Sequence, residues 1–97
     1  SLSVNEIGFF EYQKTEKHWY AILNGERVSL KRNTSAISIL QLSGNFKQIS
    51  QSHIINISFL SHIEGKRCIL SFPFDSVDNL SVSRNNLKSL QDSFYIL

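Results

Sequence analysis

The dipeptide Asn24-Gly25 places the strongest constraint on how this chain folds. Asn-Gly is the preferred turn of a two-residue β-hairpin, and the runs WYAIL before it and ERVSLKR after it are typical of strands. In the arm after the turn, Val28 and Leu30 alternate with polar residues, which predicts a sheet with one face toward water. The aromatic-rich run EIGFFEY predicts a further strand, so the first third of the chain is expected to be antiparallel β-sheet.

The spacing of apolar residues changes after residue 32 and predicts a short helix in the middle of the chain. Asn33 or Thr34 is placed to cap the first turn, and Ile37 and Leu40 fall on one side of the helix. We expect Gly44 to close the helix in the left-handed conformation, because glycine adopts it without steric cost.

Residues 46–63, FKQISQSHIINISFLSHI, carry a single formal charge, on Lys47. Two explanations are open: strands that are buried on both faces, or a surface that hydrogen-bonds something other than water. The alternation of apolar residues breaks at residues 50–53, which predicts a loop or irregular turn there.

The remaining third of the chain predicts a second hairpin and a helix. ISFLSHIE and KRCILSF flank Gly65 as the two arms of the hairpin, and Pro73 ends the strand ladder. LSVS, residues 80–83, predicts a short strand. Residues 83–94 predict a C-terminal helix that Ser83 caps and that carries apolar residues at helical spacing, namely Leu87, Leu90 and Phe94. The expected fold is therefore mainly β, with a short mid-chain helix and a C-terminal helix.

The length of 97 residues suits one compact domain, so residues 1–97 are expected to form a single module. A hydrophobic content of 41% argues against disorder, and no window is apolar enough to predict a membrane span or membrane contact. No secretory signal is visible, and the abrupt start suggests a piece of a longer protein. The single Cys68 predicts a buried thiol in a reducing compartment, and the net charge of +2 permits nucleic-acid binding without arguing for it.

The residue patterns that support catalysis or metal binding do not occur in the sequence. His18, His53 and His62 lie on separate predicted elements, without a second ligand at zinc spacing. Ser52 and His53 would point to opposite faces of a strand, whereas a catalytic dyad requires that they meet. Neither an enzyme nor a cofactor is therefore expected, and a small hydrolase built on Ser52 and His53 is the weakest alternative.

Residues 45–72, followed by LSVSRNNLKSL at residues 80–90, resemble the LytTR family of bacterial DNA-binding output domains. The family pattern has an aromatic residue, a stretch ending in Ile-His-Arg-Ser, an aromatic, two aliphatics and Asn, then a hairpin and a Val-Ser-Arg that opens the last helix. The positions that match are Phe46, Ile49, Ser52, Ile54, Ile55, Asn56, Ile63, Val82, Ser83, Arg84 and Leu87. The first hairpin and TSAISILQL are similar to the family's first strands and mid-chain helix, so the resemblance covers essentially the whole chain.

The resemblance implies antiparallel sheets of LytTR type that contact double-stranded DNA through three loop regions, in successive major grooves and the minor groove between them. Carried over by position, the contacts fall on or near Lys17, on Gln51 with Ser50 beside it, and on Arg84 with Asn85 beside it. The planar guanidinium group of Arg84 can donate two hydrogen bonds to guanine, and the side-chain amide of Gln51 can pair with adenine. Lys17 is expected to contact a phosphate.

One departure from the family pattern concerns Ser50-Gln51, which stands where the family has His-Arg. The lost charge predicts a shallower salt dependence, because that dependence counts the phosphates neutralised. His53 occupies the family's aromatic position and is expected to pack, and Asn56 is expected to satisfy backbone groups in a turn.

With the resemblance, the sequence predicts a DNA-binding domain for transcription regulation, the cytoplasmic output domain of a bacterial two-component response regulator. The resemblance implies repeated DNA sites and dimerisation through a preceding receiver or other domain, so residues 1–97 alone are expected to be monomeric. The alternative is a β-rich protein-interaction module with lost or weak DNA binding. Its anchor patch would be aromatic: Phe9, Phe10, Trp19 and Tyr20.

Overall fold

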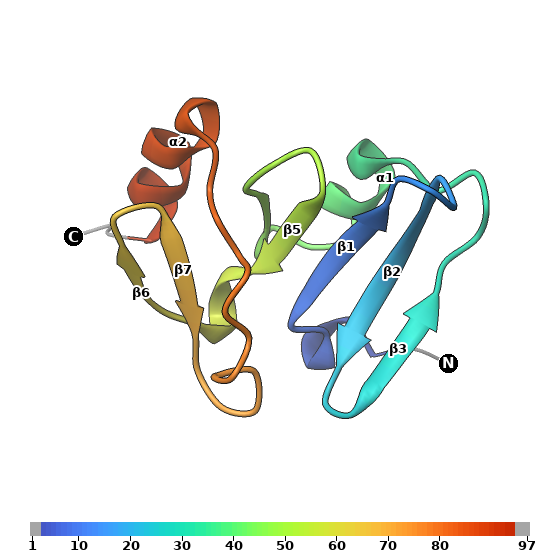
Figure 1. The fold of residues 1–97 in the computed structure, drawn as a ribbon, viewed down its shortest axis with the longest axis horizontal. Helices are drawn as coiled ribbons and strands as arrows, with labels where there is room; N and C mark the ends of the chain where they lie inside the picture. Colours follow the sequence, from blue (N-terminus) through green and yellow to red (C-terminus); the bar gives the residue numbers. More distant parts are fainter. Residues whose placement is uncertain (1–2, 95–97) are drawn as a thin grey trace.

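The computed structural model describes residues 3–94, which form two antiparallel sheets and two α-helices (Figure 1). The five-stranded sheet has the order β3-β2-β1-β5-β4, and the two-stranded sheet pairs β6 with β7. The elements are η1 (Val4–Glu6), β1 (Phe9–Gln13), β2 (His18–Leu23), β3 (Glu26–Ser29), α1 (Ala36–Leu40), β4 (Phe46–Gln48), β5 (His53–Asn56), η2 (Ile57–Phe59), β6 (Leu60–Glu64), β7 (Arg67–Leu70) and α2 (Arg84–Phe94). The mainly β fold with a short helix and a C-terminal helix is as the sequence predicts.

The first hairpin forms at Asn24-Gly25, where Leu23 pairs with Glu26 across a two-residue turn. Gly25 has a φ of 72°, a left-handed conformation that glycine adopts at no steric cost. Val28 is half-buried, whereas its neighbours in β3 are exposed. The prediction of a sheet with one wet face is therefore confirmed for this strand.

Within the weakly charged stretch 46–63, burial on both faces explains the apolar residues of β5, whereas Ser58, Ser61 and His62 are exposed. Ile54 packs with Phe10 in one core cluster, and Ile55 packs with Phe9 in the other. Because successive strand residues point to opposite faces, β5 fills two cores at once. The first cluster is closed by Ile39 of α1, and the second lies against β7, α2 and the segment before α2.

The helix α1 differs in detail from its prediction. Its cap is Ser35, not Asn33 or Thr34: the Ser35 side chain accepts from the backbone of Ser38, and the Ser38 side chain accepts from the backbone of Ser35. Within α1 the buried residue is Ile39, whereas Ile37 is 69% exposed, so the predicted apolar side was wrong for Ile37.

The end of α1 also differs from its prediction. The helix stops at Leu40, and Gly44 does not adopt a left-handed φ. A helix of five residues has too few turns for periodicity to identify its buried side or its end.

The second half of the chain follows the predicted order with two local differences. Residues 57–59 form a 3₁₀ turn, so β6 begins only at Leu60. Residues 80–83 make a single isolated bridge, Ser81 with Arg67, in place of the predicted strand. A loop lies between β4 and β5 as expected, but it covers residues 49–52, because His53 already pairs in β5. The helix α2 packs Leu87, Leu90 and Phe94 against the core. Among residues 3–94, no helix is long and apolar enough to cross a membrane.

Candidate nucleic-acid interface

Three segments that are far apart in the sequence lie along the upper edge of the molecule in Figure 1. They are the β1–β2 turn (residues 14–17), the β4–β5 loop (residues 49–52) and the first turn of α2 (residues 84–86), and we call them the three-segment edge. All five residues that the sequence proposes for DNA contact fall on this edge: Lys17, Ser50, Gln51, Arg84 and Asn85.

Backbone hydrogen bonds tie the three segments together. Tyr12, near the end of β1, donates its N–H to the Ser52 carbonyl at 2.8 Å. On the other side of the same loop, the Ser83 N–H donates to the Ile49 carbonyl at 2.7 Å, immediately before α2 begins. The β4–β5 loop is therefore fixed between the end of β1 and the start of α2, and the spacing of the segments does not depend on any exposed side chain.

Lys17 closes the β1–β2 turn in a left-handed conformation, with a φ of 53°. Positive φ is uncommon for a residue with a side chain. The same turn is braced by Tyr20, whose hydroxyl donates to the Glu16 carboxylate; this hydrogen bond raises the pKa of Tyr20. Lys17 is exposed and makes no ion pair within residues 3–94, so its ammonium group is available to an anion.

Within the β4–β5 loop, Ser50 and Gln51 have different surroundings. The Ser50 hydroxyl accepts from the Ser52 N–H at 3.2 Å, and the Ser50 carbonyl accepts from the Gln48 side-chain amide at 3.0 Å. Gln51 is exposed, whereas Ser50 is half-buried. Gln51 therefore presents the free side chain of the loop, and Gln48, which the sequence did not single out, supports the loop from β4.

Arg84 and Asn85 begin α2, and both are exposed. The turn is closed by Asn86, whose N–H donates to the Ser83 carbonyl at 3.0 Å and whose side-chain amide donates to the Ser83 hydroxyl at 2.8 Å. Arg84 has no carboxylate partner in the part of the chain that the structure describes. The guanidinium group is thus an unpaired cation at a fixed position on the edge.

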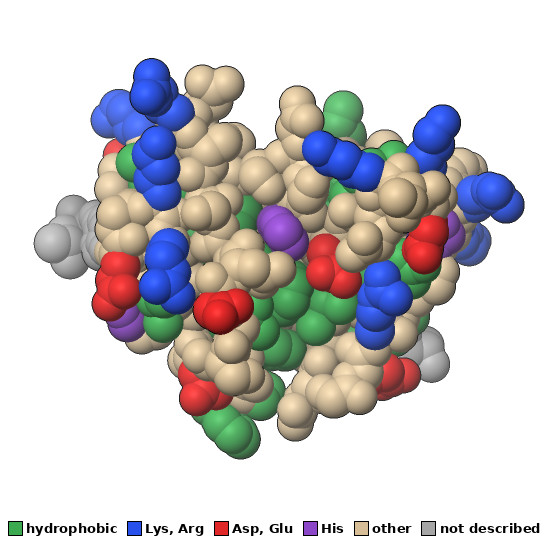
Figure 2. Space-filling model, in the orientation of Figure 1, with side chains coloured by type: hydrophobic (Ala, Val, Ile, Leu, Met, Phe, Trp, Pro, Cys, Tyr) green, Lys and Arg blue, Asp and Glu red, His purple; other side chains and the backbone are tan. Residues whose placement is uncertain are grey.

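The charge of the visible face is uneven. Figure 2 shows Lys and Arg side chains gathered mostly toward the upper edge, and Asp and Glu side chains mostly in the middle and lower parts. Although the net charge is only +2, this distribution places positive charge on the side where the three-segment edge lies. An asymmetry of this kind steers a polyanion toward one side of a protein.

His53 begins β5 directly behind the β4–β5 loop and is half-buried, with its ring centroid 6.2 Å from that of Phe9. Burial lowers the pKa of His53, while its strand neighbour Glu11 acts in the opposite direction. The net downward shift of the pKa favours the neutral ring, which packs beside Phe9 as an aromatic side chain would.

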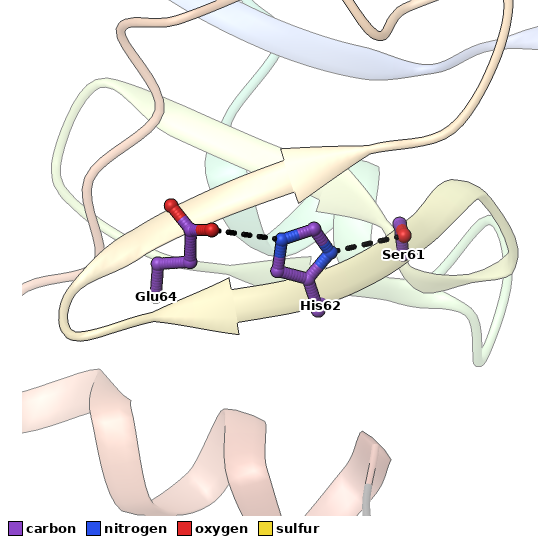
Figure 3. A network of polar contacts seen from close by, with 3 residues as sticks. All are labelled: Ser61, His62 and Glu64. Atoms are coloured by element: carbon purple, nitrogen blue, oxygen red, sulfur yellow. Dashed lines mark hydrogen bonds and ion pairs between the residues drawn. The ribbon is translucent and has the colours of Figure 1, made fainter.

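A polar network on β6 has the residue types of a catalytic triad (Figure 3). The Ser61 hydroxyl lies 3.1 Å from Nδ1 of His62, and Nε2 of His62 lies 3.1 Å from the Glu64 carboxylate. The His62 and Glu64 side chains are 49% and 61% exposed, and this network lines neither the hollow beside β4 and α2 nor the one beside Phe59 and Phe74. An exposed pair of this kind contributes about 0 to 1 kcal/mol to stability, and side chains this open to solvent are unlike the enclosed triad of a substrate site.

The structure contradicts the aromatic anchor patch of the alternative interpretation. Phe9, Phe10 and Trp19 are buried, with 5%, 0% and 5% of their surface exposed. Tyr20 is half-buried, and the Arg27 guanidinium lies 3.7 Å from its ring centroid. Phe9 and Phe10 of β1 face the two core clusters, Trp19 of β2 lies in the same cluster as Phe10, and Tyr20 is covered in part by Arg27.

The remaining chemical expectations concern Ser52, His53 and Cys68. No hydrogen bond joins the Ser52 and His53 side chains within residues 3–94, and no group of three metal-ligating side chains occurs there. Cys68 is buried, as predicted, and burial raises the pKa of its thiol to about 11. A thiol with this pKa is protonated at neutral pH and is a poor nucleophile.

Comparison with known proteins gives one family and one fold. The family model described as the LytTr DNA-binding domain matches residues 1–94. No curated protein sequence matches the chain. Among solved structures, the chain is similar to the LytTr DNA-binding domain of a protein from Bacillus cereus that is described as a methyl-accepting/DNA response regulator. The TM-score is 0.71 at 16% identity, over 94% of this chain and 83% of that one, which shows a shared fold. The chain therefore belongs to the LytTR family of DNA-binding domains.

Proposed function

We propose that this chain binds double-stranded DNA at specific sequences and regulates transcription, as the cytoplasmic output domain of a bacterial two-component response regulator. The observation that carries the proposal is the three-segment edge, where Lys17, Gln51 and Arg84 are exposed on segments joined by backbone hydrogen bonds. Membership of the LytTR family supports DNA as the ligand.

Each proposed contact has a chemical role. Arg84 places a planar fork against guanine O6 and N7, and Gln51 pairs its amide with adenine N6 and N7. Lys17 neutralises a phosphate, and Ser50 and Asn85 donate to the backbone or to base edges beside them. Arg84 supports the proposal most directly, because a cation at the start of a helix opposes the helix dipole and is unfavourable for stability alone.

In this proposal residues 1–97 are one DNA-binding module in the C-terminal part of a longer protein. A preceding receiver or other domain supplies dimerisation, so that two copies occupy repeated DNA sites about one helical turn apart. The isolated module is a monomer and binds weakly.

The test is selection of the module, fused to a neutral dimerising domain, against a random duplex library at two salt concentrations. Enrichment of a repeated motif with about one helical turn between its halves is the expected result. Salt-sensitive binding without enrichment would leave only attraction to phosphates, and an absence of binding at low salt would overturn the proposal.

A further inference from the structure

A hollow of about 380 Å³ opens between the end of α1, strand β4 and helix α2, next to the three-segment edge. Phe46 and Leu90 are its buried apolar members. Its polar lining is contributed by Ser43, Lys47, Gln48, Asn86 and Ser89. No carboxylate lines the hollow, so its only formally charged lining group is a cation.

That cation is Lys47, the single charged residue of the stretch 46–63. Lys47 is half-buried, and it forms no ion pair within residues 3–94. Its ammonium group thus has no carboxylate counter-charge among the described residues or in the lining of the hollow. An anionic ligand in the hollow would supply that counter-charge.

The neutral lining residues offer donors for the same ligand. The Ser43 hydroxyl accepts from the Asn45 N–H at 3.1 Å, which leaves its own hydrogen to donate. Asn86 and Gln48 each use one amide hydrogen, toward the Ser83 hydroxyl and the Ser50 carbonyl, and each retains a second. Several donors around one ammonium group, with no competing acceptor of opposite charge, are suited to an oxyanion.

The hollow is continuous with the residues proposed to read DNA. Gln48 supports the loop that carries Gln51, and Asn86 lies in the same helical turn as Arg84. Any ligand between Gln48 and Asn86 therefore lies between two of the segments proposed to contact bases. Phosphodiesters of a duplex flank the base edges at this position of an interface.

We propose that this hollow is a phosphodiester-binding site for the DNA backbone, in which Lys47 supplies the charge and Asn86 and Gln48 supply hydrogen bonds. The inference rests on the proposed DNA binding and deepens it, because it assigns a phosphate-positioning role to residues outside the base-reading set. Occupation of the hollow fixes how deeply the neighbouring loop and helix enter the groove. Lys47 therefore determines affinity and its salt dependence, and the bases are still read by Gln51 and Arg84.

The experiment compares Lys47→Gln with the matched control Lys31→Gln, using the dimerised module and the duplex selected for it. Lys31 is exposed, and it lines neither the hollow nor the three-segment edge. Because the dimerised module carries two copies of Lys47, Lys47→Gln is expected to lower the salt slope of log K by about 1.8, the value for two phosphates. Its affinity deficit therefore shrinks about 12-fold between about 50 and about 200 mM salt. Lys31→Gln keeps the wild-type slope, and Lys47→Arg restores it.

A second measurement locates the phosphate. Replacing single phosphates of the duplex by neutral methylphosphonates weakens wild-type binding at each contacted position. At one position in each half-site, the loss is expected to disappear in Lys47→Gln and to persist in Lys31→Gln, because only Lys47→Gln lacks the charge that contacts this phosphate. Full sensitivity of Lys47→Gln at every position, with an unchanged salt slope, would overturn the site while leaving DNA binding intact.

Two further outcomes separate this proposal from others. Inorganic phosphate is titrated into the wild type and into Lys47→Gln, and binding is followed through the amide NMR signals of residues 47, 48 and 86. Lys47-dependent shifts with phosphate, together with an unchanged DNA salt slope, would make the hollow a site for small anions and would overturn the backbone assignment. Failure of the wild type to bind any duplex would overturn both the proposed function and this inference.

Discussion

Asn56 and Arg84 illustrate the difference between a polar residue that supports the fold and one that is proposed to contact DNA. Asn56 is 2% exposed; its amide donates to the Ile7 carbonyl at 2.9 Å, and its carbonyl oxygen accepts from the Ser58 N–H at 3.0 Å. Arg84 is exposed and has no ion pair within residues 3–94. Substitution of Asn56 is therefore expected to act on folding, and substitution of Arg84 on binding.

For Arg84→Ala, we expect a loss of about 1 to 3 kcal/mol in DNA-binding free energy and relaxed preference at one base pair, as for a bidentate base contact. The free energy of unfolding should change by less than about 0.5 kcal/mol, because the side chain is exposed. Selection with the variant measures the base preference, and Arg32→Ala, another exposed arginine, is the control. An unchanged sequence profile would refute the base-reading role.

His53→Phe tests whether the ring packs as a neutral aromatic. Because burial lowers the pKa of His53, the unfolded chain binds its proton more readily than the folded chain does. The contribution of His53 to the free energy of unfolding is therefore fully present above its ordinary pKa of 6.5, and it decreases as the pH falls below that value. Denaturant titrations over that range should show a smaller acid loss of stability in His53→Phe, and equal losses would contradict the assignment.

Gly8 is required by a close approach and not by its backbone conformation. A Cβ at Gly8 would lie 2.5 Å from the ring of Phe74, which is 3% exposed and has no room to move away. Gly8→Ala is expected to lower the free energy of unfolding by about 1 to 3 kcal/mol through overpacking. Gly44→Ala is the control, since a Cβ there meets no atom within 4 Å and the backbone is not left-handed; similar losses for both would contradict this reasoning.

At the scale of elements, the sequence predicts a helix or strand best where residues close in sequence determine its conformation. The Asn24-Gly25 turn and the apolar face of α2 are determined by residues close in sequence, and the structure confirms both. The cap and buried side of α1 were not predictable from local pattern, because packing of Ile39 against the sheet sets the orientation of so short a helix. Likewise, residues 80–83 have the composition of a strand, but they pair with β7 through a single bridge, between Ser81 and Arg67.

The cap of α1 can be tested by paired substitutions. Ser35→Ala removes the side-chain oxygen that accepts from the Ser38 N–H and should cost about 0.5 to 2 kcal/mol of stability. Thr34→Ala changes a neighbouring residue that the sequence nominated as the cap, and it should cost less. Chemical denaturation measures both, and a larger loss in Thr34→Ala would move the cap back to the predicted position.

At the scale of the whole molecule, the residue pattern alone could not predict which distant segments lie side by side. Periodicity places Lys17, Gln51 and Arg84 on separate elements, and only the long-range bonds from Tyr12 and Ser83 bring their segments to one edge. Resemblance to a family anticipated this grouping. The hollow around Lys47 was not anticipated, since it requires β4 and α2 to face each other.

The two core clusters are expected to unfold together, because β5 contributes Ile54 to one and Ile55 to the other. Each cluster contains one natural reporter: Trp19, the only tryptophan, in one, and Cys68, the only cysteine, in the other. The midpoint of Trp19 fluorescence in a denaturant titration should coincide with the midpoint of Cys68 labelling by a thiol reagent. Separate midpoints would mean that residues 1–97 are not a single cooperative module.

The hydrogen bonds that join the three segments to one another link main-chain atoms, from the Tyr12 N–H to the Ser52 carbonyl and from the Ser83 N–H to the Ile49 carbonyl. Main-chain bonds persist when side chains are exchanged, provided that proline is not introduced at the donor positions. Residues such as Gln51 can therefore diverge during evolution without disturbing the scaffold beneath them. Under the proposed function, substitutions of exposed residues at these positions change which DNA sequence is bound while the backbone stays the same. Ser50-Gln51, which stands in place of the His-Arg of the family pattern, is expected to be such a substitution.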